Sequence, residues 1–180
     1  RELFGAVFQD YRLFSLSVTD NVLLKDNITP DETGRAVDGM KSSGVWDKVQ
    51  SLPEGENTVL TREFDENGAV LSGGEAQKVA IARVFAKPCD IVILDEPSSA
   101  LDPIAEYQMY EAMMKACRDK AVIFISHRLS SAVLADKVYL LEDGGIVEQG
   151  THFELLRQKG KYADMWEKQA EKYEMEVAAT

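Results

Sequence analysis

Apolar runs and polar breaks divide this chain into an alternation of expected strands and helices. Continuous apolar segments predict strands at residues 3–8, 90–94 and 121–125. A further pair of short strands, 137–141 and 145–148, is separated by Asp143-Gly144, which predicts a hairpin. Residues 10–19 show no clear period and are expected to form a loop.

Helix starts are marked by a hydroxyl residue followed three positions later by a glutamate, the signature of a capping box. This pattern begins at Thr29, Ser72 and Thr151, and proline follows Thr29 at the first helical position. The first two helices are expected to end near residues 44 and 86. Further helices are expected at residues 45–50, 102–118, 130–134 and 161–175.

Strands that are apolar throughout and joined by helices indicate a parallel sheet covered on both faces. The block from about residue 16 to 87 looks helical and stands apart from this alternation. The sequence therefore predicts an α/β core with an inserted helical subdomain.

Composition narrows the classes of protein. With 180 residues, 45% of them hydrophobic, the chain is long enough for one domain with a sizeable core. A net charge of -11 argues against a nucleic-acid binder and against direct contact with anionic lipid. The two cysteines, Cys89 and Cys117, lack metal-site spacing and are expected to be reduced thiols.

Three of the expected strands are followed by polar groups that suit phosphate chemistry. Gln9 follows the first, Asp95 and Glu96 end the second, and Ser126-His127 follows the third. Ligands of parallel sheets bind beyond the carboxyl ends of the strands, and a right-handed crossover places successive strand ends at one edge. Glu96 and His127 are therefore expected to converge.

Each of these signals also has a purely structural explanation. A glutamine after a strand is often a surface group, and Asp95-Glu96-Pro97 alone is compatible with a turn. His127 alone is compatible with a helix cap, and Ser72 to Glu75 with nothing more than a capped helix. Their common order and spacing is what favours a nucleotide site.

Together these motifs resemble those of the ABC (ATP-binding cassette) ATPases. Leu71 to Glu75 is similar to the family signature, Ile91 to Glu96 to the Walker B strand, and Ser98 to Asp102 to the D-loop. Gln9 matches the Q-loop and His127 the switch histidine. Other short strings resemble the exporter branch of the family: Gln9-Asp10, Phe14, Asp20-Asn21, residues 125–130 and residues 146–152.

The resemblance implies a P-loop NTPase (RecA-like) fold, ATP and Mg²⁺ as cofactors, and a role for each strand-end residue. Asp95 would hold Mg²⁺ through water, and Gln9 would reach the metal and the attacking water. Glu96 would be the general base, and His127 would contact the γ-phosphate. Gln9, Glu96 and His127 are thus the expected catalytic residues.

The signature is expected to serve a second subunit. The resemblance implies that it faces ATP held by a partner nucleotide-binding domain, identical or different, in a head-to-tail dimer. A helix N-terminus that presents backbone N–H groups favours an anion there. The residues expected to take part are Leu71, Ser72, Gly73, Gly74, Glu75 and, in the D-loop, Asp102.

One expected motif is missing. Nothing in the chain fits Gly-x-x-x-x-Gly-Lys-[Ser/Thr], the loop that cradles the phosphates. The expected organisation is therefore an N-terminally incomplete nucleotide-binding domain, inactive by itself. It divides into a core strand and Q-loop (1–15), a helical subdomain (16–87), the RecA-like core (88–160) and a C-terminal helix or tail (161–180).

The sequence favours the ATPase domain of an exporter-type ABC transporter at the cytoplasmic face of a membrane. Its Q-loop region and helical subdomain would receive the transmembrane domain. A soluble ABC protein acting on ribosomes or DNA is an alternative that the acidic charge and the exporter-like strings disfavour. A non-catalytic regulatory half is a third, which Glu96 and His127 argue against.

Overall fold

The computed structural model describes residues 2–64, 66–97 and 103–178, and for residues 2, 103–105 and 172–178 the backbone alone. The predicted D-loop at 98–102 therefore lies outside the described residues. The chain forms two compact units, residues 1–126 and residues 127–180.

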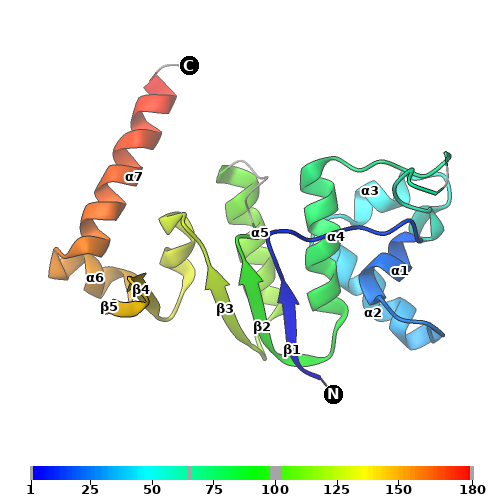
Figure 1. Cartoon of the computed structure of the whole chain (residues 1–180), viewed down its shortest axis with the longest axis horizontal. Coiled ribbons are helices and arrows are strands. Elements are labelled where there is room, and N and C mark those ends of the chain that lie inside the picture. The colour runs from blue at the N-terminus through cyan, green and yellow to red at the C-terminus, as the bar shows by residue number, and fades with distance from the viewer. Residues whose placement is uncertain (1, 65, 98–102, 179–180) are drawn as a thin grey trace. The chain divides into compact units, whose positions relative to one another are not determined.

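A parallel three-stranded sheet forms the centre of the first unit, as the apolar runs predicted (Figure 1). Val7 pairs with Leu94, and Asp95 pairs with Ile125. All three strands therefore end at the same edge. In spatial order the strands are β1 (Glu2–Val7), β2 (Cys89–Asp95) and β3 (Ala121–Ile125).

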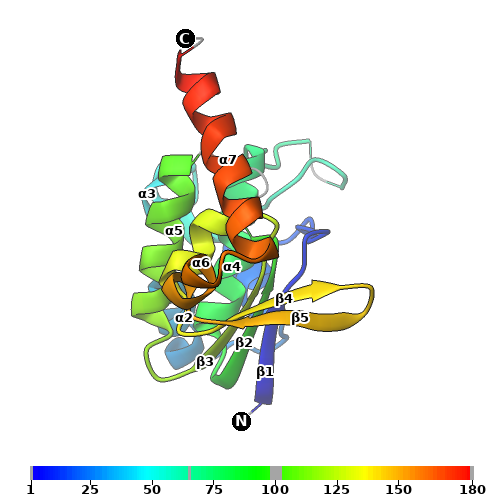
Figure 2. The same cartoon turned by 90° about the vertical axis from the view of Figure 1, so that its left-hand side faces the viewer.

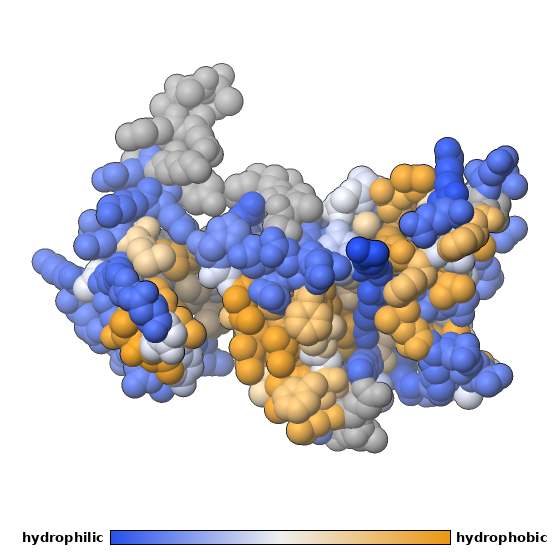
Figure 3. Space-filling model, in the orientation of Figure 1, coloured by the Kyte–Doolittle hydropathy of each residue, from blue (hydrophilic) through white to orange (hydrophobic). Residues whose placement is uncertain are grey.

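Helices of the first unit cover one face of this sheet, where the sequence led us to expect cover on both. Figures 1 and 2 show α4 (Gly73–Ala86) and α5 (Pro103–Ala116) on the same side of the strands. Both crossovers run in the same direction along the sheet, and two right-handed crossovers of that kind place their helices on one face. On the other face, four apolar side chains are about half exposed and contribute to the apolar patch of Figure 3: Phe4, Phe8, Ile123 and Ile125.

The covered face is closely packed. The rings of Tyr110 on α5 and Phe124 on β3 meet edge to face, with centroids 5.2 Å apart. At Gly5 on β1, a Cβ atom would come within 2.9 Å of the sulfur of Cys89 and 3.4 Å of Val84 on α4. This face of the sheet therefore leaves no room for a side chain at Gly5.

The helical block between β1 and β2 forms as predicted, with one addition. Both capping boxes are present, with Thr29 reciprocally bonded to Glu32 and Ser72 to Glu75. A short first helix replaces the end of the expected loop because Ser17 caps it, accepting a hydrogen bond from the N–H of Asp20. The elements are α1 (Val18–Leu23), α2 (Pro30–Ser42), α3 (Trp46–Gln50) and the 3₁₀ turn η1 (Gly55–Asn57), followed by α4.

Close approach of α2 and α4 holds this block together. A Cβ atom at Gly39 on α2 would lie 2.8 Å from the carbonyl oxygen of Ala82 on α4, so the two backbones nearly touch. Around this contact lies a core of fully or almost fully buried apolar side chains: Val18, Val22, Ala36, Met40, Val45, Val49, Leu60, Val79, Ala82 and Ala86.

The second unit carries the predicted hairpin and two C-terminal helices. Asp143 and Gly144 have φ angles of 48° and 78°, the left-handed pair that a two-residue hairpin turn requires. Its small core contains Leu129, Leu155 and Tyr162. The elements are η2 (Leu129–Leu134), β4 (Val138–Glu142), β5 (Gly145–Gly150), α6 (His152–Gln158) and α7 (Lys161–Ala178).

The cysteines are free and buried, in agreement with the prediction that Cys89 and Cys117 are thiols. Within the described part of the chain, no helix combines the length and the apolar character that a membrane crossing needs.

Candidate functional site

The carboxyl edge of the sheet gathers the predicted catalytic groups of the first unit. Asp95 is the last residue of β2, and Glu96 follows it directly. Val7 of β1 pairs with Leu94 of β2. Gln9 and Glu96 each come two residues after this pair, so both lie just beyond the carboxyl edge of the sheet. Gln9 is exposed, while Asp95 and Glu96 are partly buried.

Glu96 has an unusual backbone. Its φ angle is 46°, in the left-handed region that side chains other than glycine rarely adopt. Its N–H donates to the carbonyl oxygen of Ile125 at 2.9 Å, which extends the β2–β3 ladder by one bond and holds the turn. Strained conformations of this kind concentrate at functional sites, because surrounding structure must stabilise them.

His127 follows β3 by two residues and is the first residue of the second unit. Its side chain is exposed, and its carbonyl oxygen accepts a hydrogen bond from Gln169. Strands β2 and β3 do end side by side, as the crossover argument requires. The convergence of the Glu96 and His127 side chains stays a prediction.

The predicted signature forms the start of α4. Ser72 Oγ accepts from the N–H of Glu75 at 3.3 Å, and the Glu75 carboxylate accepts from the N–H of Ser72 at 2.8 Å. Glu75 also pairs with Lys48 at 3.3 Å. The hydrogen bond from the Ser72 backbone, and then those from the Ser72 side chain and Lys48, lower the pKa of Glu75.

This cap narrows the set of anion-binding donors at the signature. The sequence led us to expect the N–H groups of Ser72, Gly73 and Gly74 to point outward, but Glu75 occupies that of Ser72. Gly73 and Gly74 lie in the first turn of α4, where the helix itself supplies no acceptor. Leu71, the first residue of the motif, is partly buried against the core of the helical block.

The loop that follows Gln9 is attached to α4 by two side chains that sequence reasoning missed. Tyr11 donates from its hydroxyl to the carbonyl oxygen of Gly73 at 3.0 Å, and burial raises the pKa of Tyr11. Further along α4, Arg83 donates to the carbonyl oxygens of Arg12 at 2.6 Å and Asn21 at 2.8 Å. The available signal was a lone arginine within the apolar part of α4.

Asn21 fixes the rest of this loop. Its side chain is fully buried, and its Oδ1 accepts from the N–H of Phe14 at 2.8 Å. Its Nδ2 lies 2.9 to 3.1 Å from three backbone carbonyl oxygens, those of Phe14, Leu16 and Ser17. One amide group therefore determines the path of the chain from the Q-loop into α1.

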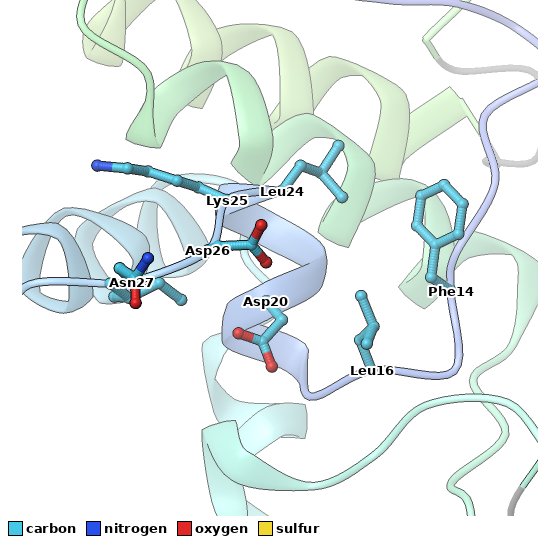
Figure 4. A pocket seen from close by; sticks show the side chains of 8 residues that line it. Phe14, Leu16, Asp20, Leu24, Lys25, Asp26 and Asn27 are labelled. Carbon is cyan, nitrogen blue, oxygen red and sulfur yellow. The ribbon is translucent and has the colours of Figure 1, made fainter.

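A hollow of about 640 Å³ lies beside this loop. Figure 4 shows Phe14, Leu16 and Leu24 around it, with the carboxylates of Asp20 and Asp26 nearby. The three apolar side chains are each about half exposed. Lys25 and Asn27 also line the hollow, so its lining combines apolar, polar and charged side chains.

The donors at the sheet edge suit a magnesium ion. Asp95 offers carboxylate oxygens and Gln9 an amide oxygen as ligands, and Mg²⁺ is held by one or two carboxylates together with water and phosphate oxygens. In the described residues, no group of three histidines, cysteines or carboxylates forms a complete protein cage for a metal. Asp102 lies outside the described residues.

Comparisons with known proteins agree on one family. The family model described as ABC transporter matches residues 1–99. The chain is 39% identical over 169 residues to ATP-binding cassette sub-family B member 6 of Mesocricetus auratus, covering 94% of this chain and 19% of that protein. It is also 39% identical over 166 residues to a putative multidrug export ATP-binding/permease protein of Staphylococcus aureus. That match covers 92% of this chain and 28% of that protein.

A solved structure gives the same result. The structure of a bacterial Atm1-family ABC exporter with ATP bound matches with a TM-score of 0.80 and 35% identity, over 93% of this chain and 28% of that one. The chain thus spans between about a fifth and just over a quarter of the proteins it matches. On the family model, the relatives and the fold together, this chain belongs to the ABC transporter family.

Proposed function

We propose that this chain is part of the ATP-hydrolysing domain of an exporter-type ABC transporter, at the cytoplasmic face of a membrane. Hydrolysis in the full-length protein drives substrate movement across that membrane. Similarity to proteins named as exporters, over more than nine tenths of the chain, supports this function over one on ribosomes or DNA.

Glu96 carries the proposal. Its backbone has a positive φ angle, which is unfavourable for glutamate and is a feature that concentrates at functional sites. It also lies directly after a β-strand at the carboxyl edge of a parallel sheet, where the ligands of such sheets bind. We assign Glu96 the role of general base, taking a proton from the water that attacks the γ-phosphorus of ATP. Gln9 leaves the same edge and is assigned to orient that water.

Asp95 and His127 complete the proposed half-site. Asp95 holds Mg²⁺ through water, with Gln9 as a second oxygen donor, and the ion when bound neutralises charge on the phosphate oxygens. His127 donates a hydrogen bond to the γ-phosphate and so senses whether ATP or its product is present. Each of these residues ends or follows a strand of the same sheet.

The start of α4 is assigned to a different nucleotide. The N–H groups of Gly73 and Gly74, together with the Ser72 hydroxyl, face the γ-phosphate of ATP held by a second nucleotide-binding domain. Asp102 serves communication across the same interface. Hydrolysis therefore requires a dimer, made of identical or different domains.

The hollow beside Phe14 is assigned to the transmembrane domain. Hydrogen bonds of Tyr11 and Arg83 join the loop after Gln9 to α4. A displacement of the residues around the hollow would therefore move both the Q-loop and the signature helix. The helical block of residues 16–87 then moves with it as the coupling subdomain. This chain of contacts gives a physical route from the membrane domain to the two half-sites.

The 180 residues alone are proposed to be inactive. No Gly-x-x-x-x-Gly-Lys-[Ser/Thr] sequence is present, so nothing in the chain provides the usual backbone cradle and lysine for the phosphates. Calorimetric titration of the isolated chain with ATP should show no binding in the micromolar range. A micromolar dissociation constant would contradict this part of the proposal.

Substitution of the proposed base tests the function. In the full-length transporter, Glu96→Gln should abolish steady-state ATP hydrolysis and leave ATP binding intact, because the amide keeps the shape but cannot accept the proton. Glu111→Gln, at an exposed site on α5, is the matched control and should hydrolyse ATP normally. Steady-state hydrolysis retained by Glu96→Gln would overturn the role of Glu96.

A further inference from the structure

The side-chain amide of Gln169 on α7 makes two hydrogen bonds to the backbone next to His127. Its Nε2 donates to the carbonyl oxygen of His127 at 2.8 Å, and its Oε1 accepts from the N–H of Leu129 at 3.0 Å. The two bonds span the turn between β3 and η2, 40 and 42 residues away in the sequence. The backbone on either side of Arg128 is therefore held by one side chain.

These two hydrogen bonds take the place of a local cap at the start of η2. Leu129 is the first residue of η2, so its N–H has no acceptor within the turn. At the capping position, the side chain of Arg128 makes no cap hydrogen bond to the turn. Gln169 supplies the acceptor instead, in the way that an N-cap side chain normally does.

A carboxamide meets both requirements. The carbonyl oxygen of His127 needs a donor and the N–H of Leu129 needs an acceptor, at opposite ends of the same planar group. A carboxylate of the same size offers acceptors alone, so it keeps the bond to Leu129 and repels the carbonyl of His127. These opposite demands also determine which end of the Gln169 amide is oxygen.

The helix that carries Gln169 is firmly seated in the same unit. Tyr162 on α7 is fully buried and packs with Leu129 in the core of the second unit, with Trp166 beside them. Gln169 lies one turn after Trp166 and two turns after Tyr162, on the same face of the helix. The amide thus reaches the His127 turn from a rigid support.

We propose that Gln169 is a positioning residue for His127, and that α7 thereby sets the geometry of the switch histidine in catalysis. The inference rests on the function proposed above, in which His127 contacts the γ-phosphate. Loss of the bond to the His127 carbonyl lets the turn relax, so the imidazole spends less time where it can donate to the phosphate. The consequence falls on the chemical step and leaves ATP affinity unchanged.

Two substitutions in the full-length transporter test the proposal. Gln169→Glu removes the donor to His127 and keeps the acceptor for Leu129, while Gln169→Met removes both at similar volume. Each should lower kcat for ATP hydrolysis about fivefold to tenfold, the effect of one lost hydrogen bond. The dissociation constant for ATP should stay at the wild-type value, and any fall in melting temperature should not track the fall in kcat across the two variants.

The matched control is Gln158→Glu, which makes the same chemical change at an exposed position near the end of α6 in the same unit. It adds the same charge without touching the His127 turn, so its kcat should equal that of the wild type. His127→Ala provides the reference background. In that background Gln169→Glu should cause no further fall in single-turnover hydrolysis, because the residue it positions is already gone.

The outcomes separate the inference from the proposed function. If His127→Ala abolishes turnover and both Gln169 variants hydrolyse ATP at the wild-type rate, the positioning role is wrong and the function stands. If His127→Ala itself retains full turnover, the role of His127 is wrong and the inference fails with it. An equal loss in both backgrounds, or a loss that follows the melting temperature, would show a role in folding and would overturn the inference.

Discussion

The buried amide of Asn21 offers the sharpest test of how the loop after Gln9 is held. Asn21→Asp changes one atom group without changing shape. The remaining carboxylate still accepts from the N–H of Phe14, but it faces the carbonyl oxygens of Phe14, Leu16 and Ser17 with no hydrogen to donate. Two N–H donors are lost and a charge is placed in a fully buried site.

The size of the effect follows from these contacts. Each lost hydrogen bond costs about 1 kcal/mol, and carbonyl groups left unsatisfied in a buried site add a similar amount. We therefore expect the opening of the segment from Leu13 to α1 to become easier by about 3 kcal/mol, or roughly a hundredfold in the opening equilibrium. Because the carbonyl groups disfavour the charged form, the introduced carboxyl has a raised pKa. The folded state then binds more protons than the unfolded state, so the destabilisation shrinks as the pH falls.

Hydrogen exchange measured by mass spectrometry is the appropriate assay. Peptides covering residues 13–24 should exchange roughly a hundredfold faster in Asn21→Asp, and the excess should be smaller at pH 5 than at pH 8. Asn27→Asp is the matched control, because Asn27 is exposed and its left-handed backbone tolerates aspartate. Equal exchange in the two variants would refute the argument that Asn21 organises this loop.

Three further predictions concern helix packing, the partly buried guanidinium of Arg83 and the effect of pH. Gly39→Ala should destabilise the protein by about 1–3 kcal/mol in denaturant unfolding, because its Cβ would meet the Ala82 carbonyl at 2.8 Å; Gly34→Ala, with nothing within 4 Å, should not be destabilising. Arg83→Met removes the hydrogen bonds to the carbonyl oxygens of Arg12 and Asn21, which should lower the free energy of opening of the loop after Gln9 by about 2 kcal/mol and speed its hydrogen exchange. Unchanged hydrogen exchange in this loop would contradict the prediction. Burial lowers the pKa of His152, so the unfolded chain protonates first and stability should fall as the pH drops below about 6.5; an equally steep fall in His152→Phe would refute that cause.

The placement of the proposed catalytic residues was accessible from the sequence because each of them ends or follows an expected strand. Asp95 and Glu96 follow an apolar run, and parallel pairing then brings the end of β1 to the same edge. The partners that hold the loop after Gln9 were not accessible. Arg83 acts through backbone carbonyl groups 62 and 71 residues away, and Asn21 through those of residues 14, 16 and 17. A carbonyl group leaves no trace in the pattern of side chains.

The helices that cover the sheet also show which features the sequence pattern predicts and which it does not. Apolar residues on both faces of β1 and β3 correctly predict a parallel sheet, but pattern alone led us to expect helices on both sides. Strand order decides the side on which a crossover helix lies, and strand order is a property of the assembled sheet.

Local chemistry is what the sequence by itself determined. The capping boxes at Thr29, Ser72 and Thr151 and the turn at Asp143 formed where they were predicted, because each is complete within four or five residues. Tertiary structure decided which distant groups complete one another. Gln169 is an ordinary polar residue of a polar helix until α7 packs beside the turn at His127, since only then do a donor and an acceptor lie at the two ends of its amide.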